Sequence, residues 1–289
     1  MKHTNVIFDL SNIAWIARHA NLNKDEPFTR ELLMYSVLNM IKFISLDYKA
    51  TGILIACDAS NGWRYDIYPQ YKAQRDESRD EFYDEVKSVM NDLMIFFNTC
   101  TSIPAVKVAR AEADDIIGVA SKISPHDTVI VSSDKDFIQL IDHKTKLYSP
   151  PLRAERTTSD RDYELFLKCI RGDTGDNIHS AYPRVRETFL VKAWNDKNEM
   201  VNLMETKRKI DGVRVGDAYK LNRSLIDLNL IPKYIETNII VELNKASIGE
   251  GYSSYSQLKT LQFLGQNNLK KIADELSVYN NLFKKRFCL

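Results

Sequence analysis

Three short apolar runs along the chain each lead to an aspartate. They are Val6 to Phe8 before Asp9, Ile53 to Cys57 before Asp58, and Thr128 to Val131, which two serines separate from Asp134 and Asp136. Strands that are apolar at nearly every position are typical of a parallel sheet covered by helices on both faces. Ligands of such sheets bind in the crevice beyond the carboxyl ends of the strands. The pattern therefore predicts an α/β fold with an acidic site at one edge of the sheet.

Helical periodicity occupies the stretches between and after these strands. Apolar stripes run over residues 30–49 and 81–97, and further short strands are expected at 105–108 and 146–148. Helices are expected at 111–120 and from Ser159 to about Gly172, with short helical stripes beyond residue 178. We therefore expect an α/β domain over residues 1–165 and a smaller helical domain over residues 166–289.

Composition narrows the class of protein. The 289 residues are 44% apolar and 27% charged, which is typical of a soluble globular protein. The net charge is +1, but residues 201–289 hold 14 Lys/Arg against 9 Asp/Glu, a weak indication of a polyanionic partner. The four cysteines form no CxxC pair, which argues against zinc and fits a reducing compartment. The chain has no run of about 18 apolar residues, so we expect no membrane segment, no export and a cytoplasmic location.

Between Gly62 and Arg79 aromatic rings alternate with cations. The residues concerned are Trp63, Arg64, Tyr65, Tyr68, Tyr71, Lys72, Arg75 and Arg79. Such a mixture suits a surface that stacks on bases and neutralises phosphates. An amphipathic region with buried rings and solvated cations explains the same pattern equally well.

The acidic residues are more informative about chemistry as a group than one by one. They are the strand-end residues Asp9, Asp58, Asp134 and Asp136 and the loop residues Glu112, Asp114, Asp115, Asp173 and Asp176. Any one of them is explained by a helix cap or a surface charge. Gathered at one edge, they would raise one another's pKa values unless cations intervene, and hard divalent ions suit an all-oxygen site. Two such ions about 4 Å apart can activate a water and stabilise the leaving oxygen in phosphodiester cleavage. The chain lacks the GxSxG and GxxxxGK[ST] motifs, which disfavours a serine hydrolase and a P-loop nucleotidase.

An ordered set of motifs extends over most of the chain. It comprises FDLSN around Asp9, CDASNGWR from Cys57, YPQYKAQR from Tyr68, EADDIIGV from Glu112, SSDKDFIQL from Ser132, GDTGDN from Gly172 and SLIDLNLIP from Ser224. The sequence resembles the metal-dependent 5′ nucleases, the flap endonuclease and 5′-3′ exonuclease superfamily, and most of all its T-even phage ribonuclease H branch. The resemblance implies a PIN-like 5′-nuclease core, a helical arch over residues 68–97 and a C-terminal helical DNA-binding domain.

The resemblance also implies roles for individual residues. Asp9, Asp58, Glu112, Asp114 and Asp134 match acids around a first metal, Asp136, Asp173 and Asp176 match the second-metal group, and Asp115 matches a further acid. Arg64, Lys72 and Arg75 match cations on and before the arch that approach the scissile phosphate or the threaded strand. Tyr68, Tyr71 and Arg79 are the remaining nucleic-acid candidates of this region, and either tyrosine could stack on a base or simply pack.

The sequence departs from the family after GDTGDN. Many relatives have a glycine-rich hairpin there that binds a monovalent cation and the duplex backbone, whereas residues 178–186 contain no glycine. Arg184, Arg186 and Lys192 are candidates for direct phosphate contacts instead. A solvated basic face accounts for them equally well.

The expectation is thus a monomeric structure-selective 5′ nuclease with two Mg²⁺ ions, or Mn²⁺ in their place. Its substrates would be DNA and RNA:DNA duplexes with 5′ ends or flaps, including RNA primers in DNA replication. Residues 282–287 are considered as a peptide for a sliding clamp, with single-stranded-DNA-binding protein as another candidate partner, and a frayed end is the plainer interpretation. The alternatives are a non-catalytic DNA-junction binder and a PIN-type single-strand ribonuclease.

Overall fold

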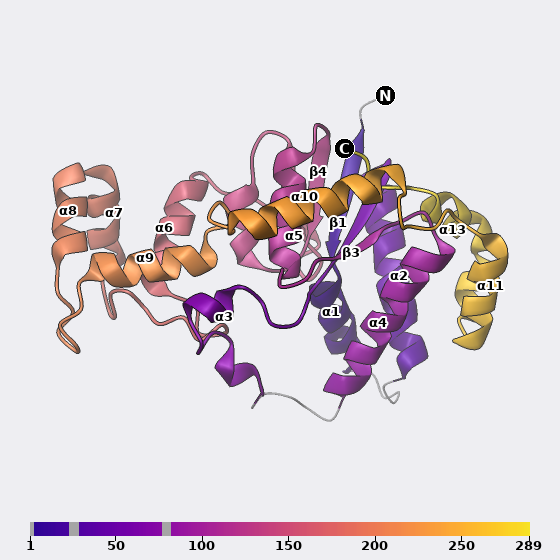
Figure 1. Ribbon diagram of the computed structural model, residues 1–289, viewed down its shortest axis with the longest axis horizontal. Coiled ribbons are helices and arrows are strands. Elements are labelled where there is room, and N and C mark those ends of the chain that lie inside the picture. Colours follow the sequence, from indigo (N-terminus) through magenta and orange to yellow (C-terminus); the bar gives the residue numbers. More distant parts are fainter. Residues whose placement is uncertain (1–2, 23–28, 77–81) are drawn as a thin grey trace. The chain divides into compact units, whose positions relative to one another are not determined.

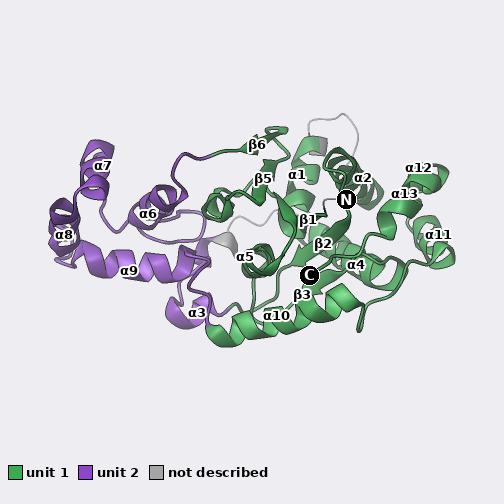
Figure 2. Cartoon of the chain, turned by 90° about the horizontal axis from the view of Figure 1, so that it is seen from above, with its two compact units in different colours: residues 1–62, 80–157, 233–289 green, residues 63–79, 158–232 purple. Residues whose placement is uncertain are grey.

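The computed structural model describes residues 3–22, 29–76 and 82–289. They belong to two compact units (Figure 2). Unit 1 combines residues 1–62, 80–157 and 233–289, and unit 2 combines residues 63–79 and 158–232. This division differs from the boundary expected at residue 165. Residues 233–289 pack with the sheet, and residues 63–76 pack with the helices after residue 158.

Unit 1 is built on a six-stranded sheet (Figure 1). Its strands are β1 (Thr4–Asp9), β2 (Gly52–Cys57), β3 (Ala105–Lys107), β4 (Asp127–Val131), β5 (Thr145–Ser149) and β6 (Ala154–Arg156). The strand order is β3-β2-β1-β4-β5-β6, and only the pair β5 and β6 is antiparallel. The predicted α/β fold with a mainly parallel sheet is confirmed. The short edge strand β6 lacks the apolar run by which the other strands are recognised.

Helices cover both faces of this sheet. They are α1 (Leu10–Leu22), α2 (Arg30–Asp47), α4 (Tyr83–Cys100), α5 (Ala113–Ile123), α10 (Lys233–Ile248), α11 (Gln257–Gln266), α12 (Lys270–Asp274) and α13 (Leu276–Phe283). Val6 and Phe8 lie in one core cluster with residues of α1, α2 and α4. The intervening residue Ile7, like Leu54 and Ile130, is fully buried on the other face, where α5 contacts the sheet. Continuous apolar strands are the consequence of burial on both faces.

The carboxyl end of the chain is part of the core of unit 1. Leu282, Phe283 and Phe287 are at most 1% exposed. The backbone N–H of Ile53 donates to the carbonyl of Lys285 at 3.2 Å, and the Lys285 ammonium donates to the Ala50 carbonyl at 2.6 Å. This segment is therefore neither a frayed end nor an exposed clamp-binding peptide, because its apolar side chains already fill the core beside β2.

Unit 2 is helical. It contains α3 (Arg64–Ile67), a 3₁₀ helix (Ala73–Asp76), α6 (Arg161–Arg171), α7 (Glu187–Asn195), α8 (Lys197–Glu205) and α9 (Val215–Ile226). Phe166, Leu190, Leu203 and Val215 form its main core, with α6 packed on α9 and α8 packed on both α7 and α9. Gly172 ends α6 with a positive φ of 74°, a conformation that an L residue rarely adopts.

The stretch 68–97, expected as a helical arch, is divided between the units. Residues from Tyr83 onward form α4, whose buried side chains Val86, Val89, Leu93 and Phe97 pack in the core of unit 1. The apolar stripe predicted over residues 81–97 corresponds to the core-facing side of this helix. The part before Asp76 belongs to unit 2.

Candidate active site

Three of the predicted acids end adjacent parallel strands. β1 lies between β2 and β4, so Asp9, Asp58 and Asp134 follow three neighbouring strands at their carboxyl ends. The chain continues from β1 to β2 on one side and returns at β4 on the other. This is the topological switch point at which open α/β sheets bind ligands.

Asp9 is the buried centre of this group, with 6% of its surface exposed. One carboxylate oxygen accepts the Asn12 backbone N–H at 3.0 Å, and the other accepts the Ser132 hydroxyl at 3.2 Å. Burial, and then the negative charges of Asp58 and Asp134, raise the pKa of Asp9 to about 7. A cation bound nearby would favour the ionised form of Asp9 and lower its pKa.

Two short polar networks hold the acids around Asp9. The Ser132 hydroxyl that donates to Asp9 also accepts the backbone N–H of Asp134 at 3.1 Å. Asn12 accepts the Ser133 backbone N–H at 2.8 Å and thereby ties the end of β1 to the end of β4. Asn12 and the two serines stand inside the FDLSN and SSDKD motifs, yet only the carboxylates were predicted as site residues.

Asp134 also begins the 3₁₀ helix Lys135–Leu140, where its carboxylate accepts the Asp136 backbone N–H at 2.8 Å. Asp134 and Asp136 are both half-buried. Arg156 of β6 donates to the Ser133 carbonyl at 3.3 Å, which brings a cation to the same edge. The sequence offered no signal for Arg156, because it lies on the short strand β6.

The acids of the EADD motif surround the start of α5. Asp58 accepts the backbone N–H of Ala113 at 2.9 Å, which attaches the end of β2 to this helix. Glu112 and Asp115 form a capping box, in which Asp115 accepts the Glu112 backbone N–H at 2.9 Å. Asp115 is fully buried, so a structural role as a helix cap accounts for it. Glu112 is 7% exposed and Asp114 is half-buried.

Carboxylates of this kind fit a hard divalent cation. Among the described residues, no three acidic, histidine or cysteine side chains converge as a complete set of metal ligands. Mg²⁺ does not require such a set, because it keeps several waters and is commonly held by one or two carboxylates. The donor chemistry and the raised pKa of Asp9 both fit a cation at this edge.

The GDTGDN turn lies in unit 2 against the YPQYKAQR segment. The Tyr71 hydroxyl donates to the Asp176 carboxylate at 3.0 Å, and the Lys72 backbone N–H donates to the Asp176 carbonyl at 2.9 Å. Asn177 donates to the Gln70 carbonyl at 2.8 Å. Lys72 has a positive φ of 56° and its ammonium lies 4.8 Å from the centre of the Tyr71 ring. The fold therefore brings the backbone of the predicted catalytic lysine to the predicted acid Asp176.

Asp173 has a cation of the protein as its partner. The Lys168 ammonium lies 2.6 Å from its carboxylate, and the Gly175 backbone N–H donates to it at 2.8 Å. Although burial raises the pKa of Asp173, these contacts outweigh it and hold that pKa below its ordinary value. The expected link from Asp134 and Asp136 to Asp173 and Asp176 joins residues of different units and stays a prediction.

Two of the predicted site residues are buried in unit 2. Arg64 is 3% exposed, donates to the Leu225 carbonyl at 2.8 Å and lies 4.5 Å from the centre of the Trp63 ring. It is a core cation of unit 2, and its expected approach to a phosphate stays a prediction. Tyr71 is 2% exposed and packs edge-on against Tyr65, so it is not available as a stacking platform. Half-buried Tyr68 remains a candidate.

The other predicted cations vary in their surroundings. Arg184 and Arg186 are exposed beside the start of α7. Lys192 is also exposed, but it forms an ion pair of 2.5 Å with Glu199 that raises the pKa of Lys192 and offsets its charge. Arg75 lies in the 3₁₀ helix 73–76, and Arg79 lies outside the described residues.

An acidic edge at the switch point of a mainly parallel sheet defines an α/β protein whose donor chemistry fits a divalent cation. Residues 4–168 match the family model of the 5′-3′ exonuclease N-terminal resolvase-like domain. The chain belongs to this 5′-3′ exonuclease and flap endonuclease family.

Individual relatives agree with this assignment. Ribonuclease H of Enterobacteria phage T4 is 26% identical over 86% of this chain and 89% of the relative. The flap endonuclease of Escherichia phage T5 is 29% identical over 60% of this chain and 63% of its own length. DNA polymerase I of Lactococcus lactis is 25% identical over 90% of this chain, which spans only 33% of that longer protein.

A solved structure shares the fold. The phage T5 flap endonuclease, crystallised as a pseudo-enzyme-product complex with DNA and metal ions, superposes with a TM-score of 0.63. The match covers 92% of this chain and all of the other, at 19% identity. None of the helices within the described residues is both long and apolar enough to span a membrane.

Proposed function

We propose that this chain is a Mg²⁺-dependent, structure-selective 5′ nuclease that hydrolyses phosphodiesters near 5′ ends. The observation that carries the proposal is the buried Asp9 between Asp58 and Asp134 at the switch point, with its pKa raised to about 7. Family membership supports the same reaction class. The substrates that we propose are 5′ flaps and RNA primers on DNA, as in DNA replication.

Asp9, Asp58 and Asp134 are proposed to hold the first Mg²⁺, with Glu112 and Asp114 beside them. Asp136, Asp173 and Asp176 are proposed for the second ion. Bound ions of this kind activate water and stabilise the departing oxygen in phosphodiester hydrolysis. The Ser132 hydroxyl and the Asn12 backbone N–H orient the Asp9 carboxylate, so that its remaining lone pairs face a fixed direction.

Lys72 is the side chain proposed to act on the phosphate. Its backbone N–H is fixed by Asp176, so the ammonium has a defined starting point, and a positive charge there stabilises negative charge that develops on the transferring phosphoryl group. No protein side chain is required as the nucleophile. Arg75, Arg79, Arg184 and Arg186 are proposed to bind the nucleic-acid backbone.

The test is cleavage of a labelled 5′-flap oligonucleotide in Mg²⁺ and in EDTA, with the products mapped. We expect Mg²⁺-dependent cuts at or near the junction. Binding without cleavage in Mg²⁺ would instead indicate a non-catalytic junction binder. Faster cleavage of unstructured single-stranded RNA than of a primer-template duplex would indicate a PIN-type ribonuclease.

A further inference from the structure

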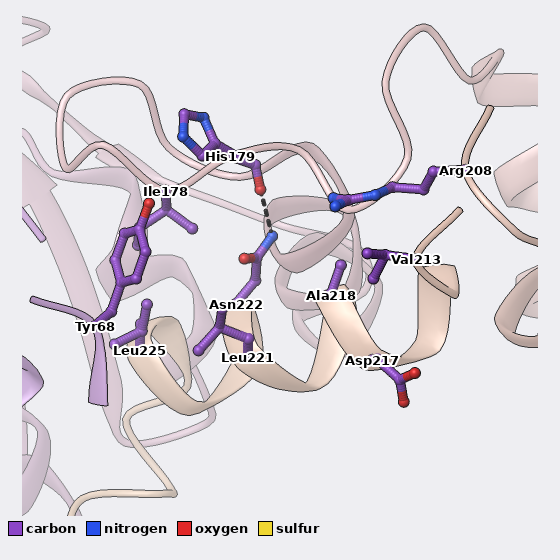
Figure 3. Close-up of a pocket in the computed structure, with 10 residues that line it drawn as sticks. All are labelled: Tyr68, Ile178, His179, Arg208, Val213, Asp217, Ala218, Leu221, Asn222 and Leu225. Atoms are coloured by element: carbon purple, nitrogen blue, oxygen red, sulfur yellow. Dashed lines mark hydrogen bonds between the residues drawn. The ribbon is translucent and has the colours of Figure 1, made fainter. Parts of the chain in front are cut away.

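Unit 2 contains a pocket of about 260 Å³ whose lining includes none of the predicted acids and shares Tyr68 with the predicted nucleic-acid-binding residues (Figure 3). Its walls come from α9, from the residues after GDTGDN, from Tyr68 and from the segment between α8 and α9. The lining residues are Tyr68, Ile178, His179, Arg208, Val213, Asp217, Ala218, Leu221, Asn222 and Leu225. The volume is smaller than that of pockets for drug-sized ligands, so it suits a single ring system.

The pocket has an apolar wall with an aromatic ring at one end. Ile178, Leu221 and Leu225 lie near Tyr68, and the Tyr68 ring borders this side in Figure 3. Apolar side chains next to an aromatic ring favour a flat ligand, because such a ligand can contact the side chains and stack on the ring at once. Nucleic-acid bases are ligands of this shape, and each has a π face.

Asn222 places one directed polar atom in this wall. Its side chain is 96% buried, and its amide nitrogen donates to the carbonyls of Cys169 and His179, both at 2.8 Å. These two bonds fix which end of the amide is the oxygen. Figure 3 shows the oxygen on the side of Tyr68, and no described residue donates a hydrogen bond to it. Because this oxygen faces the pocket, a ligand with an exocyclic amine or ring N–H can donate a hydrogen bond to it.

A guanidinium that is paired with a carboxylate faces the pocket. The Arg208 guanidinium points into it in Figure 3, and its position is fixed by Asp211 and by the Ser180 carbonyl at 3.4 Å. The Asp217 carboxylate points away from the other lining residues and pairs with Arg214 at 3.0 Å. Because Asp211 offsets the charge of Arg208, the guanidinium offers a ligand directed N–H groups, to which a phosphate oxygen can accept.

We propose that this pocket binds the base of one unpaired nucleotide, with its phosphate toward Arg208. Two sources supply this chemistry: an unpaired nucleotide of a bound strand, or a free nucleoside monophosphate such as hydrolysis releases. Only the choice between these sources rests on the proposed nuclease function. Tyr68 shortly precedes Lys72 in the chain, and Ile178 follows Asp176, to which the Lys72 backbone N–H donates. A ligand in the pocket would contact both segments and so stabilise the GDTGDN turn.

The first experiment is an NMR titration of the full chain in EDTA, where no cleavage can occur. AMP, ribose 5-phosphate and inorganic phosphate are the probes, and the His179 ring and the methyl groups of Leu221 and Leu225 report on the pocket. We expect saturable shifts with AMP that ribose 5-phosphate and phosphate do not reproduce. Equal shifts with all three probes would overturn the proposal, because the site would then recognise only phosphate.

The second experiment uses two pocket variants and a matched control. Tyr68→Ala should weaken base binding by about 10-fold, which is within the range of base–aromatic stacking, while Tyr68→Phe keeps it. Ala218→Leu should weaken it by filling the pocket. The control is Tyr234→Ala, the same change at a half-exposed tyrosine of unit 1. Unchanged binding in both folded pocket variants contradicts the proposal.

The source is then decided with metal-free flap oligonucleotides that carry either an unpaired nucleotide or an abasic site at one position. A preference for the nucleotide that Tyr68→Ala removes assigns the pocket to the bound strand. AMP binding without that preference assigns it to the free nucleotide, and the absence of both overturns the inference. Because these readouts need no hydrolysis, a failed flap-cleavage assay would refute the proposed function and leave this result intact.

Discussion

The two groups of acids in this chain are held in opposite ways. At the edge of the sheet in unit 1, the Asn12 backbone N–H and the Ser132 hydroxyl hold Asp9, and burial, followed by the neighbouring carboxylates, raises its pKa to about 7. In the GDTGDN turn of unit 2, Lys168 lies 2.6 Å from Asp173 and holds the pKa of that carboxyl below its ordinary value. The first group is arranged to receive a cation, whereas the second already has one from the protein.

The largest expected effect comes from removing one acid of each group. Asp134→Ala and Asp176→Ala should each lower the cleavage rate by at least about 10³-fold with substrate binding largely kept, because metal ligation contributes several kcal/mol to the transition state. Rates are measured in single-turnover flap cleavage and binding in EDTA. The control is Asp162→Ala, an exposed acid of α6 outside both groups.

The pair of variants also tests whether the two groups act as one site. Loss of cleavage in both variants is the expected result. Full activity of Asp176→Ala at saturating Mg²⁺, with Asp134→Ala inactive, would restrict the reaction to the acids of unit 1. Wild-type cleavage by both variants would refute the proposed metal chemistry.

Lys72→Ala is expected to lower the cleavage rate by about 10²-fold, since a positioned positive charge stabilises the transition state more than the bound substrate. The rate constant at saturating substrate should fall more than the affinity does. Lys87→Ala is a matched control, because Lys87 also lies over a tyrosine ring, at 4.6 Å from the centre of Tyr83. Equal losses of affinity and rate would assign Lys72 to substrate binding alone.

Lys168→Met is expected to strengthen divalent-ion binding at Asp173 by about 10-fold, because the ion no longer competes with an ammonium at 2.6 Å. The measurement is Mn²⁺-induced line broadening of Asp173 and Gly175 in NMR spectra. Lys192→Met removes another ion pair of unit 2 and should change nothing. Weaker Mn²⁺ binding in Lys168→Met would show that the lysine orients Asp173 for the metal.

Asp9→Asn gives the smallest expected effect, on stability. The pKa of Asp9 is about 7 in the folded protein against an ordinary value of 3.8, so ionising it costs folding free energy as the pH rises from 3.8 to 7. Without metal, the melting temperature of Asp9→Asn should exceed that of the wild type at pH 8 by on the order of 5 °C. The difference should vanish near pH 4, where both side chains are neutral.

Thermal melts at several pH values measure this difference, with Asp160→Asn as the contrasting variant. Hydrogen bonds from Tyr163, Trp194 and Asp162 outweigh desolvation and lower the pKa of Asp160. The stability it contributes is present above its ordinary pKa and is lost as the pH falls through the lowered one. Asp160→Asn should therefore destabilise the protein at pH 8. A lower melting temperature of Asp9→Asn at pH 8 would contradict the description of the first group.

The local pattern of apolar and polar residues predicted most helices and strands, because each of these depends on residues close together in the sequence. Five of the six strands, α2, α5 and α6 follow from apolar periodicity and from signals such as the glycine at residue 172. The strand β6 and the packing of residues 282–287 could not be predicted, because both depend on partners far along the chain.

The sequence alone determined the α/β class and the gathering of Asp9, Asp58 and Asp134, because apolar parallel strands place their carboxyl ends at one edge. Only the tertiary structure decided how individual side chains are used. It buries Arg64 and Tyr71, assigns Asp115 to a helix cap and places Lys168 on Asp173. The tertiary structure also forms the pocket that Tyr68 helps to line. The reason is physical: residue type and spacing specify which chemistry is available, whereas burial and partners arise only when distant segments pack together.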